Sequence, residues 1–185
     1  MTELLIDRVV SGIGALLLVC DGAKLCALGF GDDDDATLRS VRARYGEVAF
    51  RDADDPAEIT SRMRAYFGGE VTALDAIAVE TGGTPFQREV WVALRDIPPG
   101  TTISYGELAR RIGRPSATRA VGLTNGLNPV AVVVPCHRVI GADASLTGYG
   151  GGLHRKRWLL EHEGLRIRNG TKVETADQLA FAGLL

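Results

Sequence analysis

The sequence is poor in the residues that cross-link small domains or bind metals. Its three cysteines are an odd number, which argues against a disulfide framework. The cysteines are Cys20, Cys26 and Cys136, and the only histidines are His137, His154 and His162. Because no two of these residues have a CxxC or other zinc-ligand spacing, we expect no metal site and no cofactor.

A long apolar segment is also missing. The longest apolar run near the N-terminus, IGALLLVC, is far too short to cross a bilayer. It lies between Asp7 and Asp21, whereas a secretory leader has basic flanks. With 45% hydrophobic and 24% charged residues, the composition is that of an ordinary globular protein. We therefore expect a cytoplasmic chain of one or two domains that does not bind a membrane.

The net charge of −2 conceals an asymmetry between the two halves of the chain. Residues 1–84 carry 8 Lys and Arg against 15 Asp and Glu, whereas residues 85–185 carry 13 against 8. A basic half can bind a polyanion. On charge alone, two solvated surfaces are the simpler explanation.

Residues 1–83 predict a small antiparallel sheet with helices. The strand candidates are LLIDRVV (4–10), GALLLVC (14–20) and KLCALGF (24–30), and Asp21-Gly22 between the last two is a strong hairpin signal. One helix is predicted after the acidic run 32–35, and another from its N-cap Asp55 to Gly68. The aromatic residues of the second helix, Tyr66 and Phe67, are expected in the core.

Helical patterns dominate the chain from residue 84 onward. Thr84 and Gln87 match a capping box, and Ser104 and Glu107 match a second one. Ser116 is predicted to cap the following short helix. The last helix lies in HRKRWLLEHEG (154–164), and residues 169–185 are predicted to form an irregular or weakly helical tail.

The two short helices joined by GRPS (113–116) are typical of a helix-turn-helix, although helical hairpins share this pattern. Small residues cover part of the second helix, at Ala117, Ala120 and Gly122, and Arg119 projects from among them. Small side chains allow close approach either to a neighbouring helix or to a ligand.

The segment VVVPCHRVIG (132–141) places Cys136 and His137 inside an apolar run. A free cysteine has a pKa of about 8.5, and burial raises the pKa further. A nucleophilic cysteine needs a base, and that base needs an orienting partner. Adjacent side chains in extended chain point apart, so His137 can act only through a water or a turn at Pro135. Taken alone, the pair favours an inert structural cysteine.

The wider context resembles a known family. PCHRV (135–139) is similar to the active-site signature of the O6-alkylguanine-DNA alkyltransferases, or methylated-DNA–protein-cysteine methyltransferases. The similarity extends over residues 84–164, from TPFQREVWVAL to WLLEHEG, with the spacing between motifs preserved. The first domain resembles the family only in outline.

The resemblance implies a catalytic set. Cys136 accepts the alkyl group, His137 deprotonates it through a water, and Glu163 orients His137. Asn128 holds the turn that carries Cys136 against the recognition helix. Tyr105 donates a proton or hydrogen bond to N3 of the leaving guanine.

The resemblance also implies a surface for double-stranded DNA, bound in the minor groove with the damaged nucleotide flipped out. Arg119 is the finger that enters the duplex, and the carbonyls of Cys136 and Val139 read the exocyclic amine. The other residues assigned to DNA or the base are Ser104, Thr118, Ala120, Gly122, Tyr149, Gly150 and Gly151.

These expectations combine into an α+β fold with three parts. Residues 1–83 form the N-terminal domain, ribonuclease H-like in the family. Residues 84–168 form a mostly helical catalytic domain with a winged helix-turn-helix, and residues 169–185 are the tail. The expected function is single-turnover repair of O6-alkylguanine, with O4-alkylthymine as a further substrate, by a monomer that needs no protein partner. The alternatives are a non-catalytic lesion-binding or regulatory protein and a Cys-His hydrolase.

Overall fold

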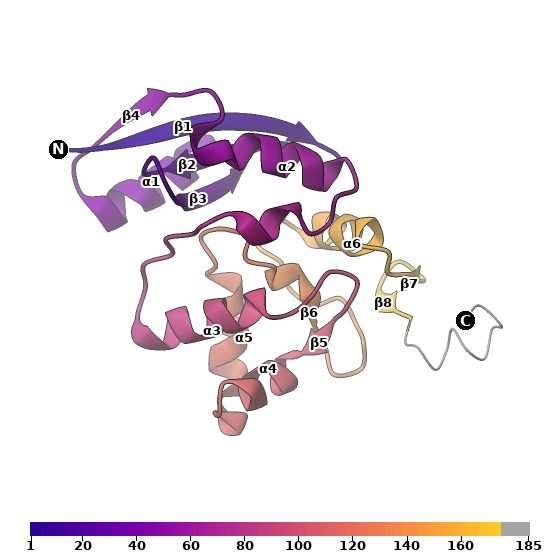
Figure 1. Ribbon diagram of the computed structural model, residues 1–185. Coiled ribbons are helices and arrows are strands. Elements are labelled where there is room, and N and C mark those ends of the chain that lie inside the picture. The colour runs from indigo at the N-terminus through magenta and orange to yellow at the C-terminus, as the bar shows by residue number, and fades with distance from the viewer. Residues whose placement is uncertain (175–185) are drawn as a thin grey trace.

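A mixed four-stranded sheet forms one end of the molecule in the computed structural model, which describes residues 1–174 (Figure 1). The strands are β1 (Thr2–Ser11), β2 (Gly14–Cys20), β3 (Leu25–Phe30) and β4 (Val48–Asp52), in the order β3-β2-β1-β4. The three predicted strands and the Asp21-Gly22 hairpin are confirmed. The fourth strand was not predicted, and it pairs in parallel with β1, so the sheet is not purely antiparallel.

The sheet is buried on both faces. Helix α1 (Asp34–Tyr45) covers one face through Val41, which packs with Leu17 and Val19 of β2. Helix α2 (Ile59–Phe67) covers the other face, where Leu16 and Leu18 of β2 lie. Burial on both sides explains why GALLLVC is apolar throughout and does not alternate.

The start of α2 is less regular than predicted. Residues Pro56–Glu58 form a short 3₁₀ turn, and the α-helix begins only at Ile59. Asp55 still supports the helix, because its carboxylate accepts a hydrogen bond from the Ser61 amide at 2.9 Å.

Four helices build most of the second half: α3 (Pro85–Arg95), α4 (Tyr105–Arg111), α5 (Thr118–Gly126) and α6 (Leu153–His162). The capping box of Thr84 and Gln87 is confirmed with both of its hydrogen bonds. Ser104 caps α4, but Glu107 does not return the bond and pairs with Arg110 instead.

The predicted N-cap at Ser116 is wrong. Residues Pro115–Ala117 form a 3₁₀ turn, and α5 begins at Thr118 without a side-chain cap. The turn still joins α4 and α5 as the predicted pair of short helices.

Two small strand pairs complete the fold. Strands β5 (Ile103–Ser104) and β6 (Val139–Ile140) run parallel, and β7 (Ile167–Arg168) pairs with β8 (Lys172–Val173) in a hairpin. Val173 is buried against Leu160 of α6, so the irregular tail predicted from residue 169 is wrong for residues 169–173. The remainder of that prediction, residues 175–185, lies outside the described residues.

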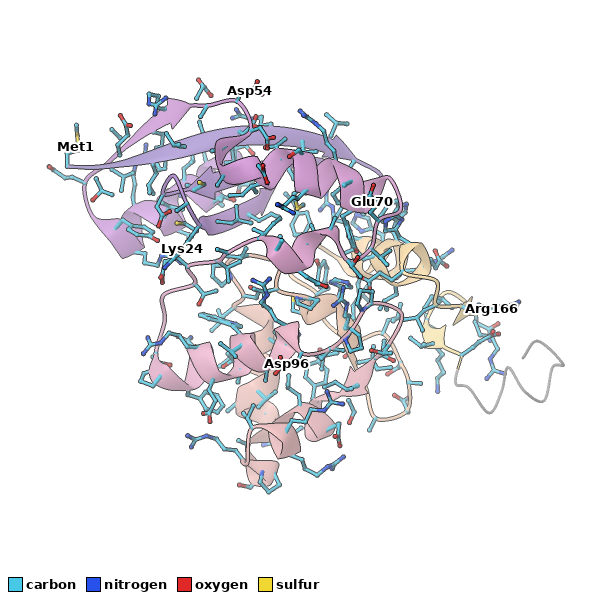
Figure 2. All side chains as sticks on the ribbon, in the orientation of Figure 1. Met1, Lys24, Asp54, Glu70, Asp96 and Arg166 are labelled. Atoms are coloured by element: carbon cyan, nitrogen blue, oxygen red, sulfur yellow. The ribbon has the colours of Figure 1, made fainter. Side chains whose placement is uncertain are left out.

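The two halves share one core, and side chains fill the space between sheet and helices (Figure 2). The edge strand β3 meets the second half directly: the Leu28 amide donates to the Pro129 carbonyl at 2.9 Å. This contact fixes the loop that follows α5 against the sheet. Within residues 1–174, no helix has the length and apolar character needed to cross a membrane.

Candidate active site

Cys136 lies in a turn that is held by hydrogen bonds from Asn128. Residues 131–140 are all buried, and Cys136–Arg138 form one turn of 3₁₀ helix after Pro135. The Asn128 amide nitrogen donates to the Val134 carbonyl at 2.7 Å, and its oxygen accepts from the Val130 amide at 3.0 Å. Asn128 therefore closes the loop that leads to Cys136, and its predicted role in holding this turn against the recognition helix stays a prediction.

The same loop contains backbone strain. Val132 has a φ of +75°, in the left-handed region that β-branched residues avoid. A residue in such a conformation costs on the order of 1–3 kcal/mol, which the surrounding contacts must offset.

The contact between this loop and α5 is made by Asn125, whose side-chain amide donates to the Cys136 carbonyl at 3.3 Å.

The Cys136 side chain is buried and opens on a cavity. Burial raises the pKa of the thiol, while the Asn128 side chain and the Lys156 charge act in the opposite direction. A cavity of about 330 Å³ lies beside it, with Asn128, Tyr149, Gly150 and Gly151 among its lining residues. The thiol is thus sheltered from bulk solvent but can be reached by a group that enters the cavity.

His137 and Glu163 form a buried pair behind the cysteine. Nε2 of His137 lies 2.9 Å from Oε1 of Glu163, and both side chains are fully buried. Burial lowers the pKa of His137, which the hydrogen bond that the ring donates to Glu163 only partly offsets, so the ring is neutral at pH 7. A carboxylate can only accept a hydrogen bond, so Nε2 carries the proton and Nδ1 is the basic atom. Nδ1 is buried and has no hydrogen-bond partner in the part of the chain that the structure describes.

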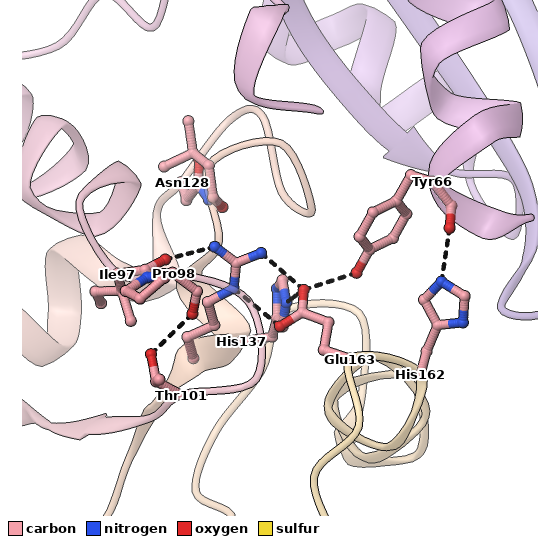
Figure 3. A network of polar contacts seen from close by, with 10 residues as sticks. Tyr66, Ile97, Pro98, Thr101, Asn128, His137, His162 and Glu163 are labelled. Carbon is pink, nitrogen blue, oxygen red and sulfur yellow. Dashed lines mark hydrogen bonds and ion pairs between the residues drawn. The ribbon is translucent and has the colours of Figure 1, made fainter. Parts of the chain in front are cut away.

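Arg138 is the third member of this buried network, and no role was predicted for it from the sequence. Its Nε and Nη2 donate to the two carboxylate oxygens of Glu163 at 2.9 and 2.8 Å, and Nη1 donates to the Ile97 carbonyl (Figure 3). Burial would raise the pKa of Glu163, but the hydrogen bonds from His137 and Arg138 outweigh it and hold that pKa well below its usual range. An Arg inside an apolar run was the signal for this contact, because a buried Arg needs an anionic partner.

The outer wall of the cavity belongs to the N-terminal half. Phe30, at the end of β3, packs edge-on against Tyr149 with ring centroids 6.0 Å apart. Gly151 is required here, since a Cβ would lie 2.5 Å from the Phe30 ring. Arg155 joins the two sides of this wall, because its guanidinium donates to the Asp32 carboxylate at 2.6 Å and to the Gly151 carbonyl at 3.0 Å. The sequence offered no sign of these contacts across the domains.

Lys156 is a second buried cation near the cysteine. Its ammonium donates to the carbonyls of Val139 and Thr147 at 2.6 and 2.8 Å. Burial lowers the pKa of Lys156 to about 8. The Val139 carbonyl, expected to read the exocyclic amine of the base, therefore already accepts one bond and has one lone pair left.

Tyr105 and Ser104 lie outside the cavity wall. The Tyr105 ring faces Gly122 of α5, and its hydroxyl accepts from Thr147 at 3.4 Å. Ser104 uses its hydroxyl to cap α4. Tyr105 thus connects α4, α5 and the loop before Tyr149.

The predicted finger lies on the surface. Thr118, Arg119 and Ala120 form the exposed first turn of α5. Within residues 1–174 the Arg119 side chain makes no hydrogen bond or ion pair. Gly122, one turn further, faces the Tyr105 ring, and an added Cβ there would meet the ring at an ordinary van der Waals distance of 3.7 Å. Arg119 is thus free to bind a ligand outside the protein.

The structure therefore brings together Cys136, His137, Glu163, Asn128 and the loop 149–151, and it leaves Arg119 on a separate exposed surface. Within the described residues, no group of three or more His, Cys, Asp or Glu side chains is placed to hold a metal ion. The arrangement combines an enclosed thiol, a neutral histidine base oriented by a carboxylate, and an adjoining cavity. This is the requirement for nucleophilic attack by a cysteine.

Comparison with known proteins agrees with this arrangement. Residues 85–165 match the model of the 6-O-methylguanine DNA methyltransferase DNA binding domain, and residues 9–81 match the ribonuclease-like domain of the same family. The methylated-DNA–protein-cysteine methyltransferase of Shigella flexneri is 42% identical over 167 residues, which cover 89% of this chain and 98% of that protein. The Mycobacterium tuberculosis (strain ATCC 25618 / H37Rv) protein of the same name is 47% identical over 156 residues, covering 83% and 88%.

A solved structure shows the same fold. The crystal structure of Mycobacterium tuberculosis OGT in complex with DNA matches with a TM-score of 0.73 and 42% identity, covering 87% of this chain and 92% of that chain. Together with the two domain matches, which span most of the sequence, this similarity establishes the family. The chain belongs to the 6-O-methylguanine DNA methyltransferases.

Proposed function

We propose that this protein repairs DNA by direct reversal, moving a methyl or larger alkyl group from O6 of guanine to Cys136. The observation that carries the proposal is the enclosed thiol on the wall of a base-sized cavity, with the His137–Glu163 pair behind it. Family membership supports the reaction class. O4-alkylthymine is a further substrate to test.

Activation of the thiol begins at His137. Nδ1 takes the proton of Cys136 through a bridging water, and Glu163 stabilises the resulting imidazolium through Nε2–H. Burial raises the pKa of the thiol, and the Asn128 side chain and the Lys156 charge offset only part of that rise, so the thiolate forms only with the help of the His137 base. The apolar surroundings keep that thiolate poorly solvated and therefore reactive.

The transfer is an in-line displacement. The Cys136 sulfur forms a bond to the alkyl carbon as the bond from that carbon to O6 breaks, and the electron pair of the broken bond stays with guanine. As the resemblance implies, Tyr105 donates a proton or a hydrogen bond to N3, so that a neutral base leaves; this requires the base to reach the loop before Tyr149, where the Tyr105 hydroxyl lies. The product is a thioether with no leaving group to restore the thiol, so each molecule acts once. The lesion is the alkyl donor and the protein is the acceptor, so the scheme requires no cofactor.

The DNA must present the lesion outside the base stack, because a base inside the duplex cannot enter the cavity. Arg119, on the exposed first turn of α5, fills the gap left in the duplex. The small residue beside it, Ala120, is exposed and allows close approach to the minor groove, whereas Gly122 faces Tyr105. Phosphate contacts come from the basic second half, residues 84–168, which makes binding independent of the DNA sequence.

We propose the cytoplasm as the compartment, because three free cysteines suit reducing conditions.

The deciding experiment is an intact-mass measurement after incubation with duplex DNA containing one O6-methylguanine. We expect one added methyl group per protein, mapped by peptide digestion to the fragment with Cys136. A lesion that survives stoichiometric protein while DNA still binds would support the lesion-binding alternative. Repeated turnover on an acyl or peptide substrate would support the hydrolase alternative.

A further inference from the structure

The N-terminal domain contributes one side chain to the catalytic network. We propose that Tyr66 of α2 is a positioning residue, which holds Glu163 so that Glu163 can orient His137. This inference rests on the proposed alkyl transfer. It gives the N-terminal domain a part in the reaction, although the sequence predicted no functional residue in that domain.

The contact is direct and buried. The Tyr66 hydroxyl donates to Oε1 of Glu163 at 2.8 Å, and Tyr66 has no exposed surface (Figure 3). Oε1 is also the oxygen that faces Nε2 of His137 at 2.9 Å. Tyr66 and His137 therefore share one carboxylate oxygen, although 71 residues separate them in the chain.

Tyr66 and Arg138 restrict different movements of the carboxylate. Arg138 grips both oxygens from one side, at 2.8 and 2.9 Å, and so fixes the plane of the group. Tyr66 approaches Oε1 from the N-terminal domain and fixes the direction in which this oxygen meets the His137 ring, while Arg138 keeps the carboxylate within reach of Nε2. Glu163 is the C-cap residue of α6: its amide still donates to the Leu159 carbonyl at 3.0 Å, so the helix end holds its backbone while Arg138 and Tyr66 hold its carboxylate.

The Tyr66 ring is itself immobilised. It packs edge-on against Phe67 and His162, with centroid distances of 5.2 and 5.0 Å. His162 lies 2.7 Å through Nε2 from the Tyr66 carbonyl, and its ring stacks on Trp158. The residue next to Glu163 in the chain thus binds the backbone of Tyr66, and α2 and α6 are joined twice. A hydroxyl held in this way orients its acceptor with little loss of conformational entropy.

The hydroxyl also moderates the charge of Glu163. Burial and the negative charge of Glu163 raise the pKa of Tyr66, so it remains a neutral donor. Hydrogen bonding to the carboxylate spreads its charge and weakens its pull on the imidazolium form of His137. The charged and titratable groups around the carboxylate and the His137 ring are Arg138, Tyr66, Lys156 and, further off, Tyr149. Without the Tyr66 hydroxyl, we expect His137 to become easier to protonate.

The test compares Tyr66→Phe with Tyr45→Phe, which removes a hydroxyl of the same domain that bonds to Arg44 and lies away from Glu163. The readout is the single-turnover rate of methyl transfer to Cys136 across the pH range in which the protein stays folded. Tyr66→Phe should slow transfer about tenfold at neutral pH, the lower end of the loss seen when an orienting partner is removed. It should also shift the acid limb of the profile to higher pH, whereas Tyr45→Phe should change neither.

A double-mutant cycle excludes a purely structural effect. If Tyr66 acts through Glu163, Tyr66→Phe should cost little further rate in a Glu163→Gln background. A tenfold loss that persists in that background, or a uniform loss with an unmoved acid limb, would overturn the inference.

A second measurement does not depend on activity. The ¹⁵N shifts of the His137 ring, followed against pH in the unreacted protein, should show protonation at higher pH in Tyr66→Phe than in the wild type, and an unchanged titration would refute the role. A wild-type protein that transfers no methyl group would refute the proposed function itself and the inference with it. Normal wild-type transfer with a normal Tyr66→Phe profile would refute the inference alone.

Discussion

The β2–β3 hairpin and the loop 128–138 both carry buried free cysteines, and they allow a direct comparison. Burial raises the pKa of the thiol in each case, at Cys20 and Cys26 in the hairpin and at Cys136 in the loop. In the hairpin, the Cys20 sulfur lies 3.1 Å from the Gly22 amide, and Cys26 donates to the Lys24 carbonyl at 3.5 Å. Neither burial nor the direction of the thiol pKa separates the two regions.

The difference lies in what surrounds the sulfur. Cys136 has a neutral histidine next to it in the chain and a buried carboxylate paired with that histidine. In the hairpin, Cys26 has Tyr45 and Arg44 nearby, and neither can act as a base at neutral pH. A cavity does not separate the two regions, because Cys26 and Cys136 each line one of about 330 Å³. The feature that distinguishes Cys136 is therefore its base.

The largest expected effect comes from replacing Cys136, the cysteine of the loop 128–138. Cys136→Ser should abolish methyl transfer, because a serine hydroxyl is not ionised at neutral pH and the site lacks a base strong enough to ionise it. Cys20→Ser and Cys26→Ser should each leave one methyl group per protein, measured by intact mass. If either hairpin variant lost methyl transfer while its circular dichroism showed an intact fold, the conclusion that only Cys136 is reactive would be contradicted.

The second effect concerns the carboxylate behind the histidine. Glu163→Gln should slow transfer by about 100-fold, since it weakens the general base. It should also lower the free energy of unfolding by roughly 3 kcal/mol, because Arg138 stays buried without an anion. Both are measurable, by single-turnover kinetics and by urea unfolding.

Glu161→Gln is the matched control for this change. Glu161 lies on the same helix and pairs with Arg157 at the surface at 3.0 Å. An exposed pair of this kind contributes about 0.5 kcal/mol. Equal losses in the two variants would show that Glu163 has no special role.

Local signals made much of the fold predictable. The capping box at Thr84 and the Asp21-Gly22 hairpin each depend on residues within a few positions, and both are confirmed. Cys136 and His137 were also visible as a pair, but their distant partner Glu163 came only from resemblance to a family. Spacing in the chain does not encode a contact between residues 26 positions apart.

The parts that were missed depend on tertiary contacts. Strand β4 is short and only partly buried, and its parallel partner β1 lies more than 40 residues earlier in the chain. Tyr66 occupies a helix position that periodicity assigns to the core, and its hydroxyl gains a role only because α6 ends beside it. Amphipathic patterns show that a residue is buried, but not which polar atom it will meet.

The third effect tests access to the cavity. Arg119→Ala should slow repair of duplex lesions by roughly tenfold, since filling the gap in the base stack offsets part of the unstacking energy. Reaction with the free modified base should be unchanged, because Arg119 lies outside the cavity. Arg157→Ala, an exposed arginine of α6, controls for loss of charge. An equal loss on duplex and free base would exclude the finger role.

The smallest effect is a difference in acid sensitivity between the two regions. Burial lowers the pKa of His137 in the folded state, whereas an unfolded histidine titrates near about 6.5. Below that value the unfolded chain binds a proton that the folded chain does not, so the stability contributed by the neutral ring is present above about 6.5 and is lost as the pH falls. The pKa of Glu163 is also lowered, but its contribution is present above about 4.3 and is lost only below that value. The hairpin, residues 14–30, contains no histidine and should contribute nothing in the upper window.

Urea unfolding at a series of pH values separates these contributions. The wild type should lose stability as the pH drops below about 6.5, and His137→Asn should flatten this part of the curve while keeping the steeper loss below about 4.3. The comparison uses the slope with pH, because His137→Asn also removes a hydrogen bond and lowers stability at every pH. His154→Asn, at an exposed position, is the control and should keep the wild-type slope. An unchanged slope in His137→Asn would mean that folding does not shift the pKa of His137, and burial of the neutral ring would then not be the cause of the acid sensitivity.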